Sequence, residues 1–183
     1  MSATSAPFGL RAAYHPSGVV RPEALTIASA YATAIYQNQP IKIGTDGTVQ
    51  AAAPGDRFSG TFQGVEYTDA EGRRRVTNRW TASTVGTDII AYITRDPAII
   101  YEIQSNAALS VGDIGKEYDW TAASGSTVTG LSSQMLDVAS SAANAGLRLL
   151  NISPGVDNAW GDTYVVAQVS PSEHQTVADI AAF

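Results

Sequence analysis

From residue 31 onward, apolar and polar residues alternate in short runs that turn-forming residues separate. Residues 41–43 alternate, Asp46-Gly47 follows, and residues 48–51 resume the alternation. Strict alternation is typical of a half-buried strand, and Asp-Gly between two such runs is a strong hairpin signal. We therefore expect an antiparallel hairpin over residues 41–51.

A second hairpin is predicted over residues 58–80, with its turn at residues 69–72. The apolar positions of its first strand change parity between Phe62 and Val65, and Gly64 lies between them. A glycine where a strand changes face is typical of a β-bulge, because one extra residue shifts the side chains to the opposite face. We therefore expect a bulge at Gly64.

The returning strand of this hairpin places Val76, Asn78 and Trp80 on one face, so we expect that face to be buried and the other to be solvated. Residues 88–94 are apolar on both faces, as in a strand near the middle of a sheet or barrel. Residues 99–103 alternate again, and a Pro turn separates the two runs. We expect both runs to belong to the core.

The C-terminal half predicts further strands at residues 147–152 and 164–169. The pattern over residues 131–145 fits either a helix or a strand with a loop, and both stay open. Strands at intervals of roughly 8–12 residues with polar turns between them favour an all-antiparallel architecture. The predicted fold is therefore mainly β, a compact antiparallel β-barrel or β-sandwich.

Both ends of the chain differ from this strand region. Residues 1–28 have no regular period, because Pro and Gly interrupt every candidate element, yet apolar and aromatic side chains are spread through them. A solvated tail is usually poorer in such residues. We interpret residues 1–28 as an extended N-terminal arm that lies on another surface and residues 29–183 as the β domain, with a loop around the protein's own core as the alternative. At the other end, Val177, Ile180 and Phe183 are spaced for one amphipathic turn.

Composition limits the chemistry. The chain has 183 residues, no cysteine and two histidines, which excludes a disulfide scaffold, a thiol nucleophile and a multi-histidine metal site within one chain. Charged residues make up 15%, against about 25% in ordinary soluble domains, so Ser, Thr, Gly and Asn must supply much of the polar surface. No apolar stretch approaches the ~20 residues of a membrane span, and the N-terminus lacks the pattern of a secretion signal, so we expect no membrane partner.

The net charge of −6 is distributed unevenly. Residues 1–100 carry a net charge of +1, and residues 101–183 carry −7. The one run of basic residues is residues 73–75, at the predicted hairpin turn, and a nucleic-acid binder needs a broader basic face. We expect no direct nucleic-acid contact. The run is either a solvated hairpin tip or a contact for an acidic neighbour, and the acidic half of another copy would make it an assembly device.

Catalytic and metal-binding signals are weak. His174 is the only candidate base for a Ser/His/Asp site, because His15 lies in the irregular N-terminal stretch. Asp157, Asn158 and Asp162 could bind calcium, but their spacing matches no EF-hand loop, and a network of turn hydrogen bonds is the simpler interpretation. We therefore expect that the protein is not an enzyme and that it binds no cofactor and no metal ion.

The three tryptophans could form a sugar-stacking platform, as in a carbohydrate-binding module. Trp80 has the parity of a core residue, whereas Trp120 and Trp160 lie beside loops and are expected to be more open. A carbohydrate- or receptor-binding β module is therefore an alternative function.

Short segments spread along most of the chain together form a recognisable sequence pattern: Pro7–Arg11, Tyr14–Gly18, Ser29–Tyr36, Ile41–Gly44, Leu147–Leu150, Asp157–Asp162 and Glu173–Gln175. These segments resemble the small virion proteins that tailed bacteriophages encode in their head modules, the head decoration or cement proteins. The resemblance implies a compact β domain on the outer surface of the virion capsid, present as a homodimer or homotrimer. It also implies that the N-terminal arm bridges neighbouring copies of the major capsid protein and stabilises the expanded head.

On this resemblance the capsid-binding residues of the arm would be Phe8, Leu10, Arg11 and Tyr14. The alternative within the same setting is another virion component, such as a head-closure, tail or baseplate protein.

Overall fold

The structure, a computed structural model, describes residues 4–177 and is mainly β, which confirms the predicted fold class. Its elements are β1 (Arg11–Tyr14), β2 (Glu23–Leu25), β3 (Ile35–Tyr36), β4 (Pro40–Ile43), β5 (Val49–Ala51), β6 (Gly60–Thr68), β7 (Arg74–Thr77), β8 (Arg79–Trp80), β9 (Thr87–Thr94), β10 (Ile100–Gln104), the 3₁₀ helix η1 (Val111–Asp113), β11 (Glu117–Trp120), β12 (Leu136–Ala142), β13 (Leu147–Ile152) and β14 (Val166–Pro171).

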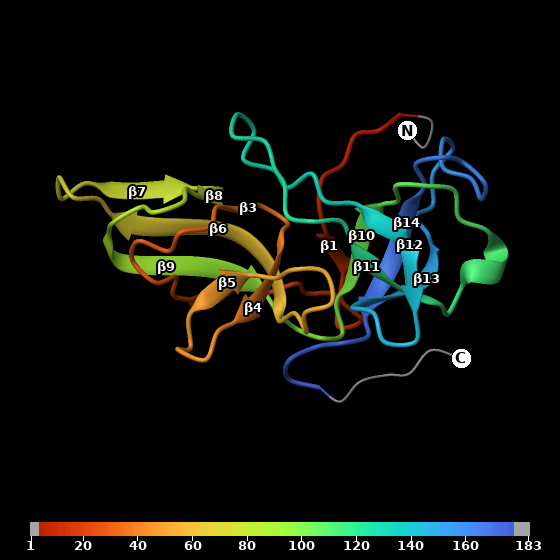
Figure 1. The fold of residues 1–183 in the computed structure, drawn as a ribbon, viewed down its shortest axis with the longest axis horizontal. Coiled ribbons are helices and arrows are strands. Elements are labelled where there is room, and N and C mark those ends of the chain that lie inside the picture. Colours follow the sequence, from red (N-terminus) through yellow and green to blue (C-terminus); the bar gives the residue numbers. More distant parts are fainter. Residues whose placement is uncertain (1–3, 178–183) are drawn as a thin grey trace.

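The strands form two larger antiparallel sheets, which lie at opposite ends of an elongated molecule (Figure 1), and one small two-stranded sheet. One sheet has the order β1-β10-β14-β13-β11-β12, and we call it the C-terminal lobe. The other has the order β2-β9-β6-β4-β5 with β7 also paired to β6, and together with the small β3-β8 sheet it forms the hairpin lobe. The sheets are sandwich-like, and the strands within the described residues do not close into a barrel.

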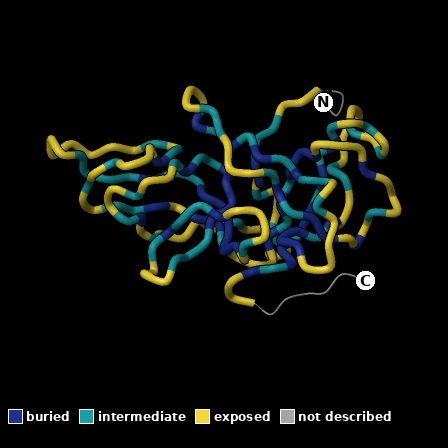
Figure 2. The backbone as a smooth tube through the Cα atoms, viewed as in Figure 1, coloured by how far each residue is buried: buried dark blue, intermediate teal, exposed yellow. Residues whose placement is uncertain are grey.

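Each lobe has its own hydrophobic core. Among the described residues, fifteen buried side chains form the core of the C-terminal lobe and nine form that of the hairpin lobe. Buried residues lie on both sides of the junction between the lobes, in the middle of the molecule (Figure 2). Phe58, from the loop before β6, contributes to the C-terminal core, so the two lobes share packing at the junction.

The local sequence signals of the hairpin lobe are confirmed. Strands β4 and β5 pair around a turn in which Gly47 has a φ of +79°, a conformation that favours glycine. The register of β6 against β9 shifts between Phe62 and Gly64, as the predicted bulge requires.

The predicted burial of Val76 is wrong, because its side chain is 73% exposed. Strand β7 pairs with the outer half of β6 alone, and both faces of this part of the hairpin are open. Trp80 is buried as expected, but it belongs to a separate strand that pairs with β3. The alternation of residues therefore grouped side chains by face, but it could not show whether another part of the protein covers that face.

The two apolar runs expected in the core are central strands of different sheets. Strand β9 lies between β2 and β6, and β10 lies between β1 and β14, so the turn that contains Pro97 carries the chain from one lobe to the other. The open question over residues 131–145 is settled in favour of a strand, β12.

The described part of the predicted arm lies along the protein's own two sheets. Strand β1 forms the edge of the C-terminal lobe, and β2 forms the edge of the hairpin lobe. Just before β1, the Leu10 N–H donates to the Asn38 carbonyl oxygen at 2.8 Å. The chain also passes close to this oxygen at Gly9, where a Cβ would lie 2.6 Å from it. This is the alternative that the sequence left open: the segment is extended, but it is part of both sheets.

The C-terminal end of the described chain also crosses the junction. After β14, His174 bridges to Phe58, and the Gln175 side chain bonds both the N–H and the carbonyl of Ile43, at 2.7 and 3.0 Å. The expected amphipathic turn involves Ile180 and Phe183, which lie outside the described residues. Within residues 4–177, no helix has the length and apolar character needed to span a membrane.

Candidate functional site

Two of the four residues that the sequence singled out, Phe8 and Arg11, meet on the C-terminal lobe. The Arg11 guanidinium lies 4.7 Å from the centre of the Phe8 ring, and its Nη2 donates to Oε2 of Glu102 at 2.6 Å. The hydroxyl of Ser153 donates to the other oxygen of Glu102, also at 2.6 Å. Charge-assisted hydrogen bonds of this kind hold the carboxylate and the guanidinium in fixed positions.

A cavity of about 480 Å³ lies beside this cluster. It lies between the N-terminal segment, the loop after β13 and strands β10 and β14, and its lining residues are Ala6, Phe8, Arg11, Glu102, Ser153, Pro154, Asn158 and Val166. A cavity in the range of roughly 300–1,000 Å³ with apolar walls and a few fixed polar groups is typical of a binding site. We call it the N-terminal cavity.

The charge state of Glu102 is set by its partners. Partial burial raises the pKa of its carboxyl, but the hydrogen bonds from Ser153 and Arg11 and the charge of Arg11 outweigh burial, so the pKa lies below its ordinary value. Glu102 is therefore ionised at neutral pH, and an incoming cation or N–H donor would compete with Arg11 for it.

Amide side chains fix the walls of the cavity. The Ala6 N–H donates to Oε1 of Gln104 at 2.8 Å, and Nε2 of Gln104 donates to the carbonyl oxygens of Thr4 and Tyr164. This single side chain therefore anchors the N-terminal segment to β10.

On the opposite wall, Nδ2 of Asn158 donates to the carbonyl oxygens of Ser153 and Val166, at 2.7 and 3.0 Å. Oδ1 of Asn158 accepts from the Val166 N–H, and Asp162 accepts from the Ala159 N–H. These contacts confirm the turn network that was the simpler interpretation of this loop. Within residues 4–177, no three His, Asp or Glu side chains are grouped as a metal ion would need.

The other two predicted arm residues lie elsewhere. Leu10 is fully buried in the C-terminal core, so its side chain stabilises this protein's own fold. Tyr14, at the end of β1, is 50% exposed and lies on the open edge of the sheet. Phe8 and Arg11 therefore meet at the cavity, whereas Leu10 and Tyr14 do not contribute to its lining.

Sequence reasoning missed Glu102 and Ser153, which complete the cluster. Glu102 is 91 residues from Arg11 and comes from an alternating strand in which a polar residue is ordinary. Its only local signal is a carboxylate between the apolar residues Tyr101 and Ile103. This signal indicates the more polar face of a strand, but it does not identify the residue that pairs with Glu102.

His174 is buried between the lobes and engaged at both ring nitrogens. Its Nε2 lies 3.1 Å from the Ser59 carbonyl oxygen, so it carries the proton, and Nδ1 accepts from the N–H and the hydroxyl of Thr176. Burial, the largest influence, lowers the pKa of this imidazole. Nε2 is bonded to a backbone carbonyl and Nδ1 to Thr176, so this geometry gives the Ser/His/Asp hypothesis no support.

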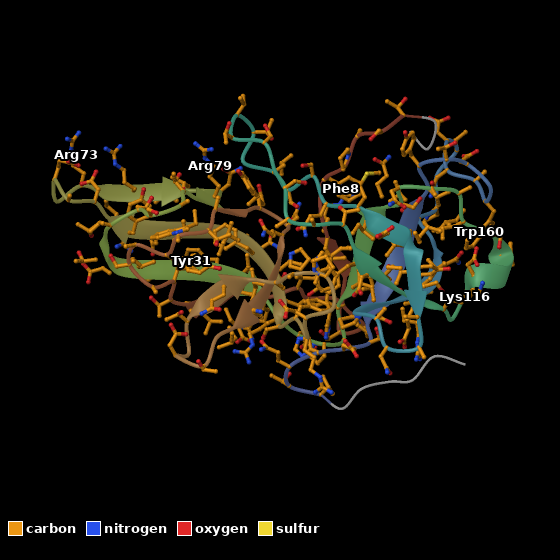
Figure 3. All side chains as sticks on the ribbon, in the orientation of Figure 1. Phe8, Tyr31, Arg73, Arg79, Lys116 and Trp160 are labelled. Atoms are coloured by element: carbon orange, nitrogen blue, oxygen red, sulfur yellow. The ribbon has the colours of Figure 1, made fainter. Side chains whose placement is uncertain are left out.

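The expected openness of Trp120 is wrong. Both Trp80 and Trp120 are fully buried, and the Trp120 ring packs edge-on against Phe58 with ring centres 5.3 Å apart. Trp160 is partly buried against the C-terminal core (Figure 3). Although Trp120 lies beside a loop in the sequence, the Phe58 side chain from the hairpin lobe covers it. The tryptophans therefore do not form a shared platform for a sugar.

Comparison of the chain with models of protein families, with curated proteins and with solved structures finds no match. The functional argument therefore rests on the sequence segments and on the geometry of the N-terminal cavity.

Proposed function

We propose that this protein is a structural virion protein that decorates the outer surface of a tailed-bacteriophage capsid and stabilises it by bridging major capsid subunits. The observation that carries the proposal is the N-terminal cavity, where Phe8 and Arg11 lie together beside the ionised Glu102. These are two of the residues that the resemblance to head decoration proteins implies as capsid contacts.

The cavity offers a capsid segment both apolar and polar contacts. An apolar side chain would lie against Phe8, Pro154 and Val166, and a carbonyl or carboxylate group would accept from the half-exposed guanidinium of Arg11. Because the described part of the N-terminal segment is already held in both sheets, binding avoids most of the ordering cost of about 1–2 kcal/mol per residue that a free arm would incur. A modest affinity at each site is sufficient, since identical sites across a shell add avidity to an oligomer.

The runner-up is another virion component, such as a head-closure, tail or baseplate protein. It shares the low charge and the β architecture, and copy number in the virion separates it from decoration. The carbohydrate-binding alternative loses its main support, because Trp120 is buried and cannot stack on a sugar.

The test is binding of purified protein to expanded capsids of the encoding phage that lack it. Deleting residues 1–28 is unsuitable, since it removes Leu10 from the core and an edge strand from each sheet. Arg11→Glu places a like charge beside Glu102 and is expected to weaken capsid binding by about tenfold or more. Arg73→Glu is the matched control, because Arg73 lies at the distant hairpin tip (Figure 3), and it should bind like the wild type.

Phe8→Ala should weaken binding in the same direction by removing an apolar wall of the cavity. Circular dichroism of each variant must match that of the wild type. Wild-type occupancy of capsids by both Phe8→Ala and Arg11→Glu would show that the cavity is not the capsid contact.

A further inference from the structure

The outer face of the hairpin-lobe sheet carries an exposed apolar side chain next to a notch. The register of β7, β6 and β9 places Val76, Glu66 and Ile90 in one row across this face and Gly64 and Tyr92 in the next. Val65 and Ala91, at the intervening positions, are buried on the opposite side. The rows follow from the pairing alone, because side chains directly opposite each other in antiparallel strands share a face.

The notch has a volume of about 400 Å³ and lies where β6 has no side chain at Gly64. Its lining residues are Gln63, Gly64, Val65, Val76, Thr77, Asn78 and Tyr92. Val76, 73% exposed, stands at its side, and the Tyr92 ring, 36% exposed, forms part of its wall. An apolar knob and an apolar hole therefore lie next to each other on the same face.

The polar groups around the notch are held in place. The Tyr92 hydroxyl donates to Oε1 of Glu66 at 2.8 Å, and Arg74 Nη2 lies 3.0 Å from the same oxygen. Nη1 of Arg74 donates to the Asp88 carbonyl oxygen at 2.9 Å. The face thus presents one fixed negative and one fixed positive group, and little side-chain entropy remains to be lost on binding.

We propose that two copies of this chain associate through this face, each inserting its Val76 into the notch of the other. A two-fold interface requires that if residue i contacts residue j, then j contacts i, and a knob beside its own hole satisfies this condition. The same symmetry brings Glu66 of each copy toward Arg74 of the other, so the charges on the two faces are complementary.

The size of the face predicts a weak dimer. The nine residues of β6 extend about 30 Å, and the four strands β7, β6, β9 and β2 span about 14 Å, which gives about 400 Å² in plan on each copy. A total of about 800 Å² is below the size of most stable interfaces, so we expect association in the micromolar range or weaker. The face and the N-terminal cavity are on different lobes, so both can be occupied at once.

Sedimentation velocity on the purified full chain, across micromolar to millimolar concentrations, tests the proposal without any capsid. The wild type should convert from monomer to dimer, and Val76→Glu should raise the dissociation constant by about tenfold or more. Val111→Glu is the matched control, because Val111 is also exposed but lies in η1 of the C-terminal lobe, and it should dimerise like the wild type.

Charge exchange gives a second test, in which circular dichroism must show that each variant keeps the wild-type fold. Arg74→Glu should weaken the dimer, and the double variant Arg74→Glu with Glu66→Arg should restore it, because both the internal pair and the pair between copies are then re-formed. A wild type that stays monomeric throughout, a trimer, or a Val76→Glu protein that dimerises normally would overturn the proposal. Loss of capsid binding in Val76→Glu with an unchanged monomer–dimer equilibrium would also overturn it and assign the face to the capsid.

Discussion

The two lobes have the same antiparallel architecture and differ in how they use it. The C-terminal lobe surrounds a larger core, and three of its basic side chains are paired with carboxylates: Arg11 with Glu102, Lys116 with Asp113 and Arg148 with Glu117. The hairpin lobe has the smaller core, adds β7 along the outer half of β6, and leaves Val76 exposed. The difference indicates a division of roles, in which one lobe supplies most of the buried apolar area and the other offers an open face.

The segments at both ends of the described chain connect these lobes. The N-terminal segment supplies an edge strand to each sheet, and the C-terminal residues 172–177 return from β14 to the loop before β6 and to β4. A chain joined at several points in this way should unfold as one unit, although each lobe has its own core.

The largest effect should come from the tryptophans at the centres of the two cores. Trp120→Ala and Trp80→Ala should each lower the free energy of unfolding by about 3–5 kcal/mol, because both rings are fully buried. Denaturant unfolding followed by circular dichroism and by fluorescence should show one coincident transition in each variant. Two separated transitions in Trp80→Ala would show that the lobes fold independently.

The ion pairs of the two lobes should differ in the same way. Arg148→Ala leaves the buried carboxylate of Glu117 without its partner at 2.9 Å and should cost about 3–5 kcal/mol of unfolding free energy. Arg75→Ala removes the pair with Asp69 on the hairpin, which solvent screens, and should leave the free energy of unfolding nearly unchanged. Equal losses in urea titrations would contradict the contrast in burial.

The N-terminal segment should matter to stability through one side chain. Leu10→Ala should lower the free energy of unfolding by about 2–5 kcal/mol, since Leu10 is fully buried in the C-terminal core. Tyr14→Ala, four residues further along the same segment, should change it by no more than about 0.5 kcal/mol because Tyr14 is half-exposed. A Leu10→Ala protein as stable as the wild type would mean that the segment leaves the sheet in solution.

A smaller effect, dependent on pH, is expected at the junction. Burial lowers the pKa of His174, with Arg95 lowering it further and Asp96 acting in the opposite direction. The unfolded chain therefore binds a proton at a higher pH than the folded chain, and stability falls as the pH drops from about 6.5 through the lower folded pKa. His174→Gln should flatten this part of the stability profile.

The control for this prediction is Gln175→Ala, which removes a junction side chain that carries no titrating proton and should keep the wild-type slope between pH 7 and 5, a range of about two units around the ordinary histidine pKa. Carboxyls such as Asp113, whose pKa is lowered to about 2 by the hydrogen bond from Lys116, lose their contribution at more acidic pH and do not interfere. An identical profile for His174→Gln and the wild type would show that the buried imidazole does not control this transition.

The sequence predicted those features that neighbouring residues determine. The Asp46-Gly47 turn and the bulge at Gly64 depend on local backbone chemistry, and both were found. The division into two sheets could not be predicted in this way, because β9 and β10 have similar apolar patterns and only their long-range partners separate them.

The candidate site was predicted in part for the same reason. Phe8 and Arg11 stood out as apolar and basic residues in an irregular segment, but their meeting with Glu102 depends on a strand 91 residues away. Sequence parity placed Val76 with Trp80, but Val76 lies opposite Glu66 on the outer face of the sheet and is exposed. Position in sequence likewise could not reveal that Phe58 covers Trp120.

The most direct test of the proposed role is the number of copies of this protein in each purified virion, measured by quantitative mass spectrometry against the major capsid protein. Decoration of a symmetric shell predicts on the order of hundreds of copies, in a fixed ratio to the major capsid protein. Six or twelve copies per virion would contradict decoration and assign the protein to a connector or tail ring, and its absence from virions would contradict a structural role in the capsid.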